Sequence, residues 1–154
     1  MFSEQNLKKI DELRKRYPTS KALVLPALWM AQQQFGWISP ETMKYVAGLL
    51  DLPVHHVYGV VTFYTMFNTK PVGKYHLQVC TNVSCMLRGG EELAEHVCSR
   101  LGVKLGENTA DQKFTVTEVE CLGSCGTAPM MQVNDDYFEN LTNDKVDKLL
   151  SEFK

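Results

Sequence analysis

The sequence lacks a strong excess of charge of either sign, a long apolar run and a visible targeting segment. Its 16 Lys and Arg residues and 18 Asp and Glu residues give a net charge of −2, so it has no basic stripe for binding nucleic acid. The longest apolar segments are interrupted by Pro26, His55 and His56, well short of the roughly 20 residues that span a bilayer. We therefore expect a soluble, cytosolic chain with no direct membrane insertion.

Nucleotide-binding and redox motifs are also absent. No G-x-G-x-x-G follows a predicted strand, so the chain has no visible dinucleotide site of its own. No C-x-x-C redox motif occurs either. The adjacent His55 and His56 would point about 100° apart on a helix, which favours a solvated or partner-facing pair over a metal site. The sequence therefore predicts no catalytic residues.

Cysteine is sparse, but four of the five cysteines fall into two close pairs. The pairs are Cys80-x4-Cys85 and Cys121-x3-Cys125. The odd number of cysteines and the lack of a secretion signal argue against a disulfide framework. Glycines lie close to both pairs, and glycine lets backbone N–H groups approach an anionic centre closely. The pattern predicts two loops that converge on one metal centre.

The spacing of these cysteines leaves the identity of the metal open. Structural zinc sites usually take paired ligands roughly two to four residues apart, most often as C-x2-C, so zinc fits less well but is not excluded. The C-x4-C-x2-C and C-x2-C-x2-C-x3-C-P runs of two common ferredoxin classes are absent. From the residues alone, iron–sulfur and zinc are equally favoured. A zinc-stabilised interaction module without electron transfer is therefore one hypothesis.

Residues 1–68 carry helical periodicity and predict a bundle of four short helices. Ser3 is placed to cap the first helix, and Pro26 is expected to kink the second. Ser39-Pro40-Glu41 is a strong start signal for the third helix. The aromatic side chains of this half are predicted to be core, with some at a protein interface. The inward stripe of the fourth helix is predicted at Val54, Val57, Val61 and Tyr64.

Residues 69–154 predict a domain of mixed helix and strand. Two alternating segments, 75–79 and 114–119, are predicted strands that run straight into Cys80 and Cys121. The carboxyl ends of strands are where open α/β sheets place their sites. The predicted order β-α-β-β-β-α is thioredoxin-like, with a small mixed sheet. The expected fold class is therefore α+β, a four-helix leader followed by a thioredoxin-like α/β domain. The remaining elements are predicted at 91–101, 130–133, 137–139 and 142–153.

Cys98 is the fifth cysteine and falls outside both pairs. It shares one face of the predicted helix 91–101 with Ala94, Val97 and Leu101. A small buried thiol behaves as a hydrophobic side chain, so Cys98 is predicted to have a packing role only.

The chain resembles one known family over nearly its whole length. This family is the thioredoxin-like [2Fe–2S] E subunit of respiratory NADH:quinone oxidoreductase (complex I). In the N-terminal half the resemblance rests on Ala31-Gln32, Phe35-Gly36-Trp37-Ile38-Ser39 and Val57-Tyr58-Gly59-Val60-Val61-Thr62-Phe63-Tyr64. In the C-terminal half it rests on Pro71-Val72-Gly73, Val79-Cys80, Cys85, Gly89, Glu120-Cys121-Leu122-Gly123-Ser124-Cys125, Ala128-Pro129 and Asn140-Leu141-Thr142.

The resemblance implies a ligand set and a cofactor. It implies that Cys80, Cys85, Cys121 and Cys125 bind one [2Fe–2S] cluster and that Cys98 does not. It also implies a partner, the larger subunit that binds FMN and NADH and carries its own cubane cluster, within the peripheral arm of the complex. The chain would then lie on the cytoplasmic face of the membrane through that complex.

The same resemblance implies the role of an electron carrier. NADH gives up two electrons as hydride, whereas a [2Fe–2S] cluster accepts one, so a flavin in the partner must split the pair. The isolated chain is therefore not expected to oxidise NADH. Close relatives in this family serve NAD-linked hydrogenases and formate dehydrogenases, and the equivalent role in such an enzyme is the alternative.

Overall fold

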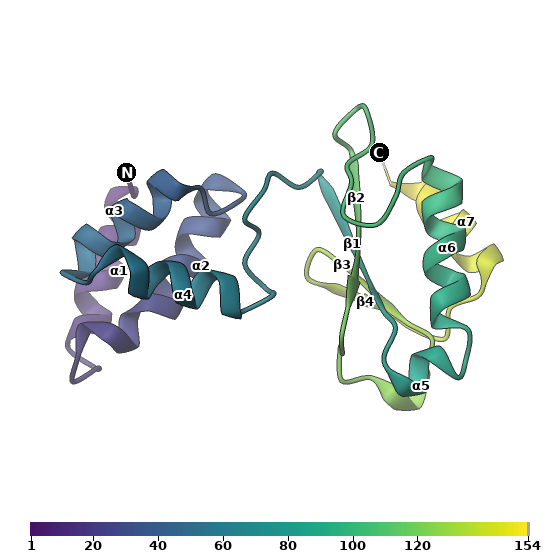
Figure 1. Cartoon of the computed structure of the whole chain (residues 1–154), viewed down its shortest axis with the longest axis horizontal. Coiled ribbons are helices and arrows are strands. Elements are labelled where there is room, and N and C mark those ends of the chain that lie inside the picture. Colours follow the sequence, from purple (N-terminus) through teal and green to yellow (C-terminus); the bar gives the residue numbers. More distant parts are fainter. Residues whose placement is uncertain (154) are drawn as a thin grey trace. The chain divides into compact units, whose positions relative to one another are not determined.

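The computed structural model describes residues 1–153, which form two compact units, Met1–Pro71 and the residues from Val72 onward. The first unit is helical and is drawn from purple to teal in Figure 1. The predicted four-helix leader is confirmed, with one additional 3₁₀ helix. Its elements are α1 (Glu4–Arg14), η1 (Ser20–Leu23), α2 (Val24–Phe35), α3 (Pro40–Leu50) and α4 (Val54–Phe63).

A single apolar core holds these helices together. Each helix is too short to be stable alone in water, so its stability depends on packing. The predicted start signal of α3 operates as expected, because Ser39 Oγ accepts a hydrogen bond from the N–H of Thr42 at 3.1 Å. Every α-helix and η1 contribute fully buried side chains, including Ile10, Leu23, Leu28, Val46, Leu50, Val57 and Val61.

Two details of the helical prediction are wrong. Pro26 does not interrupt a longer helix, because α2 begins at Val24 and Pro26 lies in its first turn, where N–H groups have no intrahelical acceptor. On α4, Val54 and Tyr64 are exposed rather than buried. Val54 is the first residue of the helix, and Tyr64 lies past its last turn with an extended backbone, so helical spacing no longer determines which way Tyr64 faces.

The second unit contains a four-stranded sheet with the order β2-β1-β3-β4. Strand β1 pairs parallel with β2 and antiparallel with β3, and β4 pairs antiparallel with β3. The predicted small mixed sheet is therefore confirmed. The elements are β1 (Tyr75–Cys80), α5 (Val83–Met86), α6 (Gly90–Leu101), β2 (Phe114–Val119), η2 (Cys125–Thr127), β3 (Met131–Val133), β4 (Asp136–Phe138) and α7 (Asn143–Glu152).

Helices α6 and α7 lie side by side on the same side of this sheet (Figure 1). Asp147 on α7 joins the two helices, since its Oδ1 lies 2.9 Å from both His96 Nε2 and Arg100 Nε on α6. The hydrogen bond from His96 and the nearby Arg100 charge hold the pKa of Asp147 below its usual value. The core between helices and sheet includes Leu77, Val79, Val97, Val116, Met131 and Val146.

Across residues 1–153, none of the helices combines the length and the apolar character needed to cross a membrane.

Candidate metal centre

The parallel pairing of β1 with β2 brings the two cysteine segments together. Cys80 is the last residue of β1 and pairs with Val119, the last residue of β2. The N–H of Thr81 donates to the carbonyl of Val119 at 3.3 Å, so the segments that follow β1 and β2 are still paired where they leave the sheet. Figure 1 shows α5 and the yellow-green loop that follows β2 at this same end of the sheet.

The first cysteine pair is buried because the chain turns back directly after β1. Asn82 caps the short helix α5, and its side-chain oxygen accepts a hydrogen bond from the N–H of Val83 at 2.6 Å. This turn returns Cys85 to the Cys80 thiol, and the two side chains interact. Cys85 is 3% exposed and Cys80 is 4% exposed. The sequence pattern did not predict α5, although Asn82 is the capping signal that marks it.

The second cysteine pair is exposed and has little regular structure around it. Cys121 follows β2 by two residues, and Cys125 begins η2. Between them, the N–H of Gly123 donates to Cys121 Sγ at 3.3 Å. Gly123 has a φ of +76°, a conformation that only glycine adopts without strain. The glycine thus aims a backbone donor at a sulfur atom, which stabilises negative charge on it.

All four paired cysteines line one cavity of about 140 Å³. In the described part of the chain, no three His, Cys, Asp or Glu side chains are grouped tightly enough to hold a single metal ion. A [2Fe–2S] cluster with four cysteine ligands takes two thiolates on each iron, which requires two pairs of thiols around one small space. Cys80 with Cys85, and Cys121 with Cys125, fit that requirement.

Burial affects the chemistry of the first pair. Burial first, and next the neighbouring Cys80 side chain, raise the pKa of the Cys85 thiol to about 11. Cys85 is therefore protonated at neutral pH when no metal is bound. Because the thiolate is the form that ligates metal, a metal held by Cys85 would be bound with release of a proton. In this buried position water cannot stabilise a Cys85 thiolate, and the positive charge of a bound metal would supply that stabilisation.

Helix α6 packs directly onto the backbone of the first pair. A Cβ atom added at Gly90, the first residue of α6, would lie 2.8 Å from the carbonyl oxygen of Cys80 and 2.9 Å from that of Cys85. Both distances are shorter than a carbon–oxygen van der Waals contact, and the atoms approached are backbone. The absence of a side chain at Gly90 is thus what allows the helix to meet the strand end.

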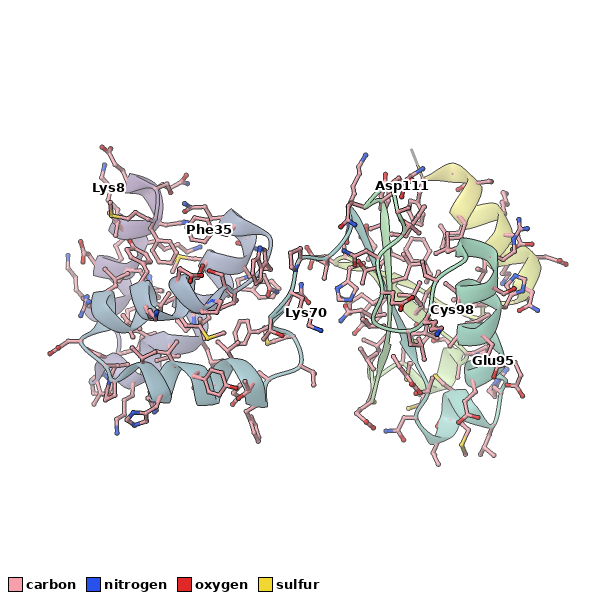
Figure 2. The ribbon with its side chains drawn as sticks, turned by 45° about the horizontal axis from the view of Figure 1, so that its top comes forward. Lys8, Phe35, Lys70, Glu95, Cys98 and Asp111 are labelled. Atoms are coloured by element: carbon pink, nitrogen blue, oxygen red, sulfur yellow. The ribbon has the colours of Figure 1, made fainter. Side chains whose placement is uncertain are left out.

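Cys98 lies apart from the cavity lined by the other four cysteines. It is on α6, about 12 Å along the helix axis from Gly90 at 1.5 Å per residue, and Figure 2 labels it there together with Glu95. Its half-buried thiol packs against the core of the second unit. Burial, and next the charge of Glu107, raise the pKa of this thiol.

A small mixed sheet, covered by helices on one side and carrying a thiol-lined cavity at its strand ends, defines a thioredoxin-like domain with a metal centre. The family model described as thioredoxin-like [2Fe-2S] ferredoxin matches residues 10–154, and the chain belongs to this family. Its cofactor is therefore a [2Fe–2S] cluster, and its chemistry is electron transfer within an oxidoreductase family.

Similar proteins cover nearly the whole chain. The E subunit of NADH-quinone oxidoreductase from Rickettsia conorii (strain ATCC VR-613 / Malish 7) is 47% identical over 156 residues, covering 99% of this chain and 93% of the relative. The E 2 subunit of NADH-quinone oxidoreductase from Rhizobium meliloti (strain 1021) is 45% identical over 145 residues, covering 94% of this chain and 86% of the relative. The predicted family is confirmed.

The fold also matches a solved structure of a larger protein. A chain in the crystal structure of NAD+-reducing [NiFe]-hydrogenase in the H2-reduced state superposes with a TM-score of 0.75 at 22% identity. The match covers 89% of this chain but only 23% of the hydrogenase chain. At this level of identity the likeness concerns the fold alone.

Proposed function

We propose that this chain is the electron-carrying subunit of an NADH:quinone oxidoreductase and that Cys80, Cys85, Cys121 and Cys125 hold its [2Fe–2S] cluster. The observation that carries the proposal is the convergence of these four thiols on one cavity. It occurs in a chain that is similar to the E subunit of NADH-quinone oxidoreductase over 99% of its length. When bound, the cluster would supply one-electron transfer, accepting one electron at a time from a donor that can split an electron pair.

The two cysteine pairs have different parts in this role. Cys80 and Cys85 are held by β1, α5 and the start of α6 and are closed off from water. Cys121 and Cys125 lie in an exposed loop. The buried pair anchors the centre in the fold, and the exposed pair keeps it near the surface. An electron donor in another protein can therefore come close to it.

The donor in this proposal is a flavin in a partner subunit that binds FMN and NADH. The turn after β1 runs through Thr81 and Asn82 into α5 and contains no glycine, unlike the glycine-rich turn that cradles a pyrophosphate. In this proposal the hydride acceptor therefore belongs to the partner. As part of such a complex, the chain would be peripheral, on the cytoplasmic face of a membrane.

An exposed aromatic surface on α4 is the proposed docking site for that partner. Tyr58 is 57% exposed and Phe63 is 77% exposed. Both belong to the segment that carried the family resemblance, and Phe63 packs edge-on against the exposed Tyr64. Large exposed aromatic side chains such as these are typical of protein interfaces.

NADH is expected to reduce the cluster only when the flavin subunit is present. The measurement is electron paramagnetic resonance after NADH addition, on the isolated chain and on the chain co-purified with an FMN- and NADH-binding subunit. The full-length Tyr58→Asp, Phe63→Asp double variant should keep its cluster but lose co-purification, because two carboxylates would be desolvated in the interface. Lys8→Asp, on the outer side of α1, is the matched surface control.

Two results would count against this proposal. If NADH fails to reduce the cluster in the intact complex, although the midpoint potential of the cluster is high enough for NADH to reduce it, the proposed function is wrong. If the double variant binds as well as the Lys8→Asp control, the docking surface is wrong and the electron-transfer role stands.

The midpoint potential of the cluster should lie roughly in the region of −400 mV, as for [2Fe–2S] centres with four thiolates, and well below the range of Rieske centres with two histidine ligands. Buried His76 is hydrogen-bonded to Thr117 within the sheet. No histidine is among the described residues that line the cavity of the four cysteines, so cysteine is the proposed ligand type. Potentiometric titration monitored by electron paramagnetic resonance checks this. A midpoint above zero would show that the ligand set is wrong.

The equivalent role in an NAD-linked hydrogenase or formate dehydrogenase is the second candidate. A chain of similar fold occurs in an NAD+-reducing hydrogenase, but at 22% identity this likeness concerns the fold alone, and the identity to the relatives from NADH-quinone oxidoreductase is more than twice as high. The family match decides against the zinc-module hypothesis. A visible absorption spectrum checks this, since a zinc protein is colourless and a [2Fe–2S] protein is red-brown.

A further inference from the structure

The loop between Cys121 and Cys125 needs support from outside itself. The first cysteine pair is buried between a strand and two helices, whereas Cys121 and Cys125 are both exposed. Within this loop, the N–H of Gly123 bonds to Cys121 Sγ, and the N–H of Thr127 donates to the carbonyl of Ser124 at 3.2 Å. These local bonds shape the turn but do not tie it to the sheet.

The edge strand β4 and the residues after it provide that tie. The hydroxyl of Tyr137 donates to the carbonyl of Leu122 at 2.8 Å. Directly after β4, Oε1 of Glu139 accepts hydrogen bonds from Ser124 Oγ and, at 2.5 Å, from Thr127 Oγ1. These contacts join positions 12 to 15 residues apart in the sequence.

Glu139 thus holds residues on both sides of one proposed ligand. Ser124 immediately precedes Cys125, and Thr127 follows it by two residues. The hydrogen bond from Ser124, and next that from Thr127, hold the pKa of Glu139 below its usual value. The carboxylate is therefore ionised at neutral pH, and a fixed negative charge lies beside the cysteine loop. No cation forms an ion pair with Glu139 among the described residues.

We propose that Glu139 is a positioning residue for the [2Fe–2S] centre, holding the Cys125 loop through Ser124 and Thr127 and lowering the midpoint potential by its charge. This inference rests on the proposed ligand set. One-electron reduction adds negative charge to the centre, and a nearby carboxylate makes that addition less favourable. Glu139 thus has two effects, one on how well the loop is ordered and one on the midpoint potential, and substitutions can separate them.

Two substitutions at Glu139 separate these effects in the full-length chain. Glu139→Gln removes the charge but keeps an oxygen that accepts from Ser124 and Thr127, so the loop should stay ordered. At a fixed solution potential, its ratio of reduced to oxidised cluster should rise roughly threefold, as expected for a screened charge near the surface. Glu139→Ala removes both charge and acceptor, so it should give the same rise and also loosen the loop.

Asp135→Asn is the matched control. It makes the same charge change in the turn between β3 and β4, and the strand register places this turn at the opposite end of β1 from Cys80. Its redox titration should follow that of the wild type. Titrations use a chemical reductant and mediators rather than NADH, so they do not depend on the partner subunit.

Hydrogen exchange on the chain without metal provides a second readout. The amides of residues 122–127 should exchange faster in Glu139→Ala than in wild type, Glu139→Gln or Asp135→Asn. The proposal is overturned if Glu139→Gln titrates together with Asp135→Asn, or if Glu139→Ala leaves exchange in this segment unchanged. Failure of the ligand set would be seen separately, as serine variants at the four paired cysteines that keep their iron and their visible absorption.

Discussion

Serine at Cys80 or Cys85 is expected to abolish the [2Fe–2S] content of the purified chain, and serine at Cys121 or Cys125 to lower it sharply. An alkoxide is a poor substitute for a thiolate ligand, and the hydroxyl ionises far less readily than the thiol. The effect should be largest at the first pair, since it is buried and water cannot take the place of the missing ligand. Iron content and visible absorption measure the outcome.

Cys98→Ala is the control for this series. The half-buried thiol packs on α6 away from the cavity, so this variant should retain full cluster content. Its loss of unfolding free energy should be modest, about 1 kcal/mol, as for a small truncation at a partly buried site. The opposite pattern, with iron lost from Cys98→Ala and retained in Cys85→Ser, would overturn the ligand assignment.

Gly90→Ala is expected to lower both the stability of the chain and its cluster content. The new methyl group would meet the carbonyl oxygens of Cys80 and Cys85 at 2.8 and 2.9 Å, and relief requires α6 to move away from both residues. Overpacking of this kind costs about 1–3 kcal/mol. Because the displaced backbone carries two proposed ligands, cluster content should fall together with stability. Chemical denaturation of the metal-free chain and iron analysis of the loaded chain measure the two effects.

Gly48→Ala provides the comparison for this prediction. Gly48 lies within α3 and has no atom within 4 Å of an added Cβ. Alanine there should leave cluster content unchanged and raise stability by roughly 0.5–1 kcal/mol, since glycine is a poor helix former. Equal behaviour of Gly90→Ala and Gly48→Ala would show that the close approach of α6 to the cysteines is unimportant.

The helical half was predictable where capping and periodicity agree. Ser39-Pro40-Glu41 predicted the start of α3 because a side-chain cap and a proline act within one turn. Errors arose at helix ends. Tyr64 was assigned to the buried stripe, yet the helix stops before it. The prediction carried helical spacing one residue too far, and helix ends depend on the packing of the following segment.

The short helix α5 was missed for a related reason. It has four residues, Val83–Met86, which is too few to show any periodic pattern. Only its cap, Asn82, is visible in the sequence. Its consequence is nevertheless large, because α5 returns Cys85 to the side of Cys80 and buries both thiols.

Local patterns were enough to locate the two cysteine pairs at strand ends and to separate Cys98 from them. Alternation and spacing are properties of consecutive residues, so they can be read without knowing the neighbours of each segment. The resemblance to a known family, carried by short motifs around those cysteines, then implied the cofactor, and the family match confirmed it.

Long-range packing alone decided how the centre is built. The pairing of β1 with β2 brings Cys80 to Val119. The lack of a side chain at Gly90 allows α6 to pack against the backbone of Cys80 and Cys85. The edge strand β4 brings Glu139 to Ser124. None of these contacts leaves a local pattern, because each joins segments whose adjacency depends on strand order and on the fit of side chains across the sheet. Burial of one pair and exposure of the other follow from the same packing, since helices cover only the first.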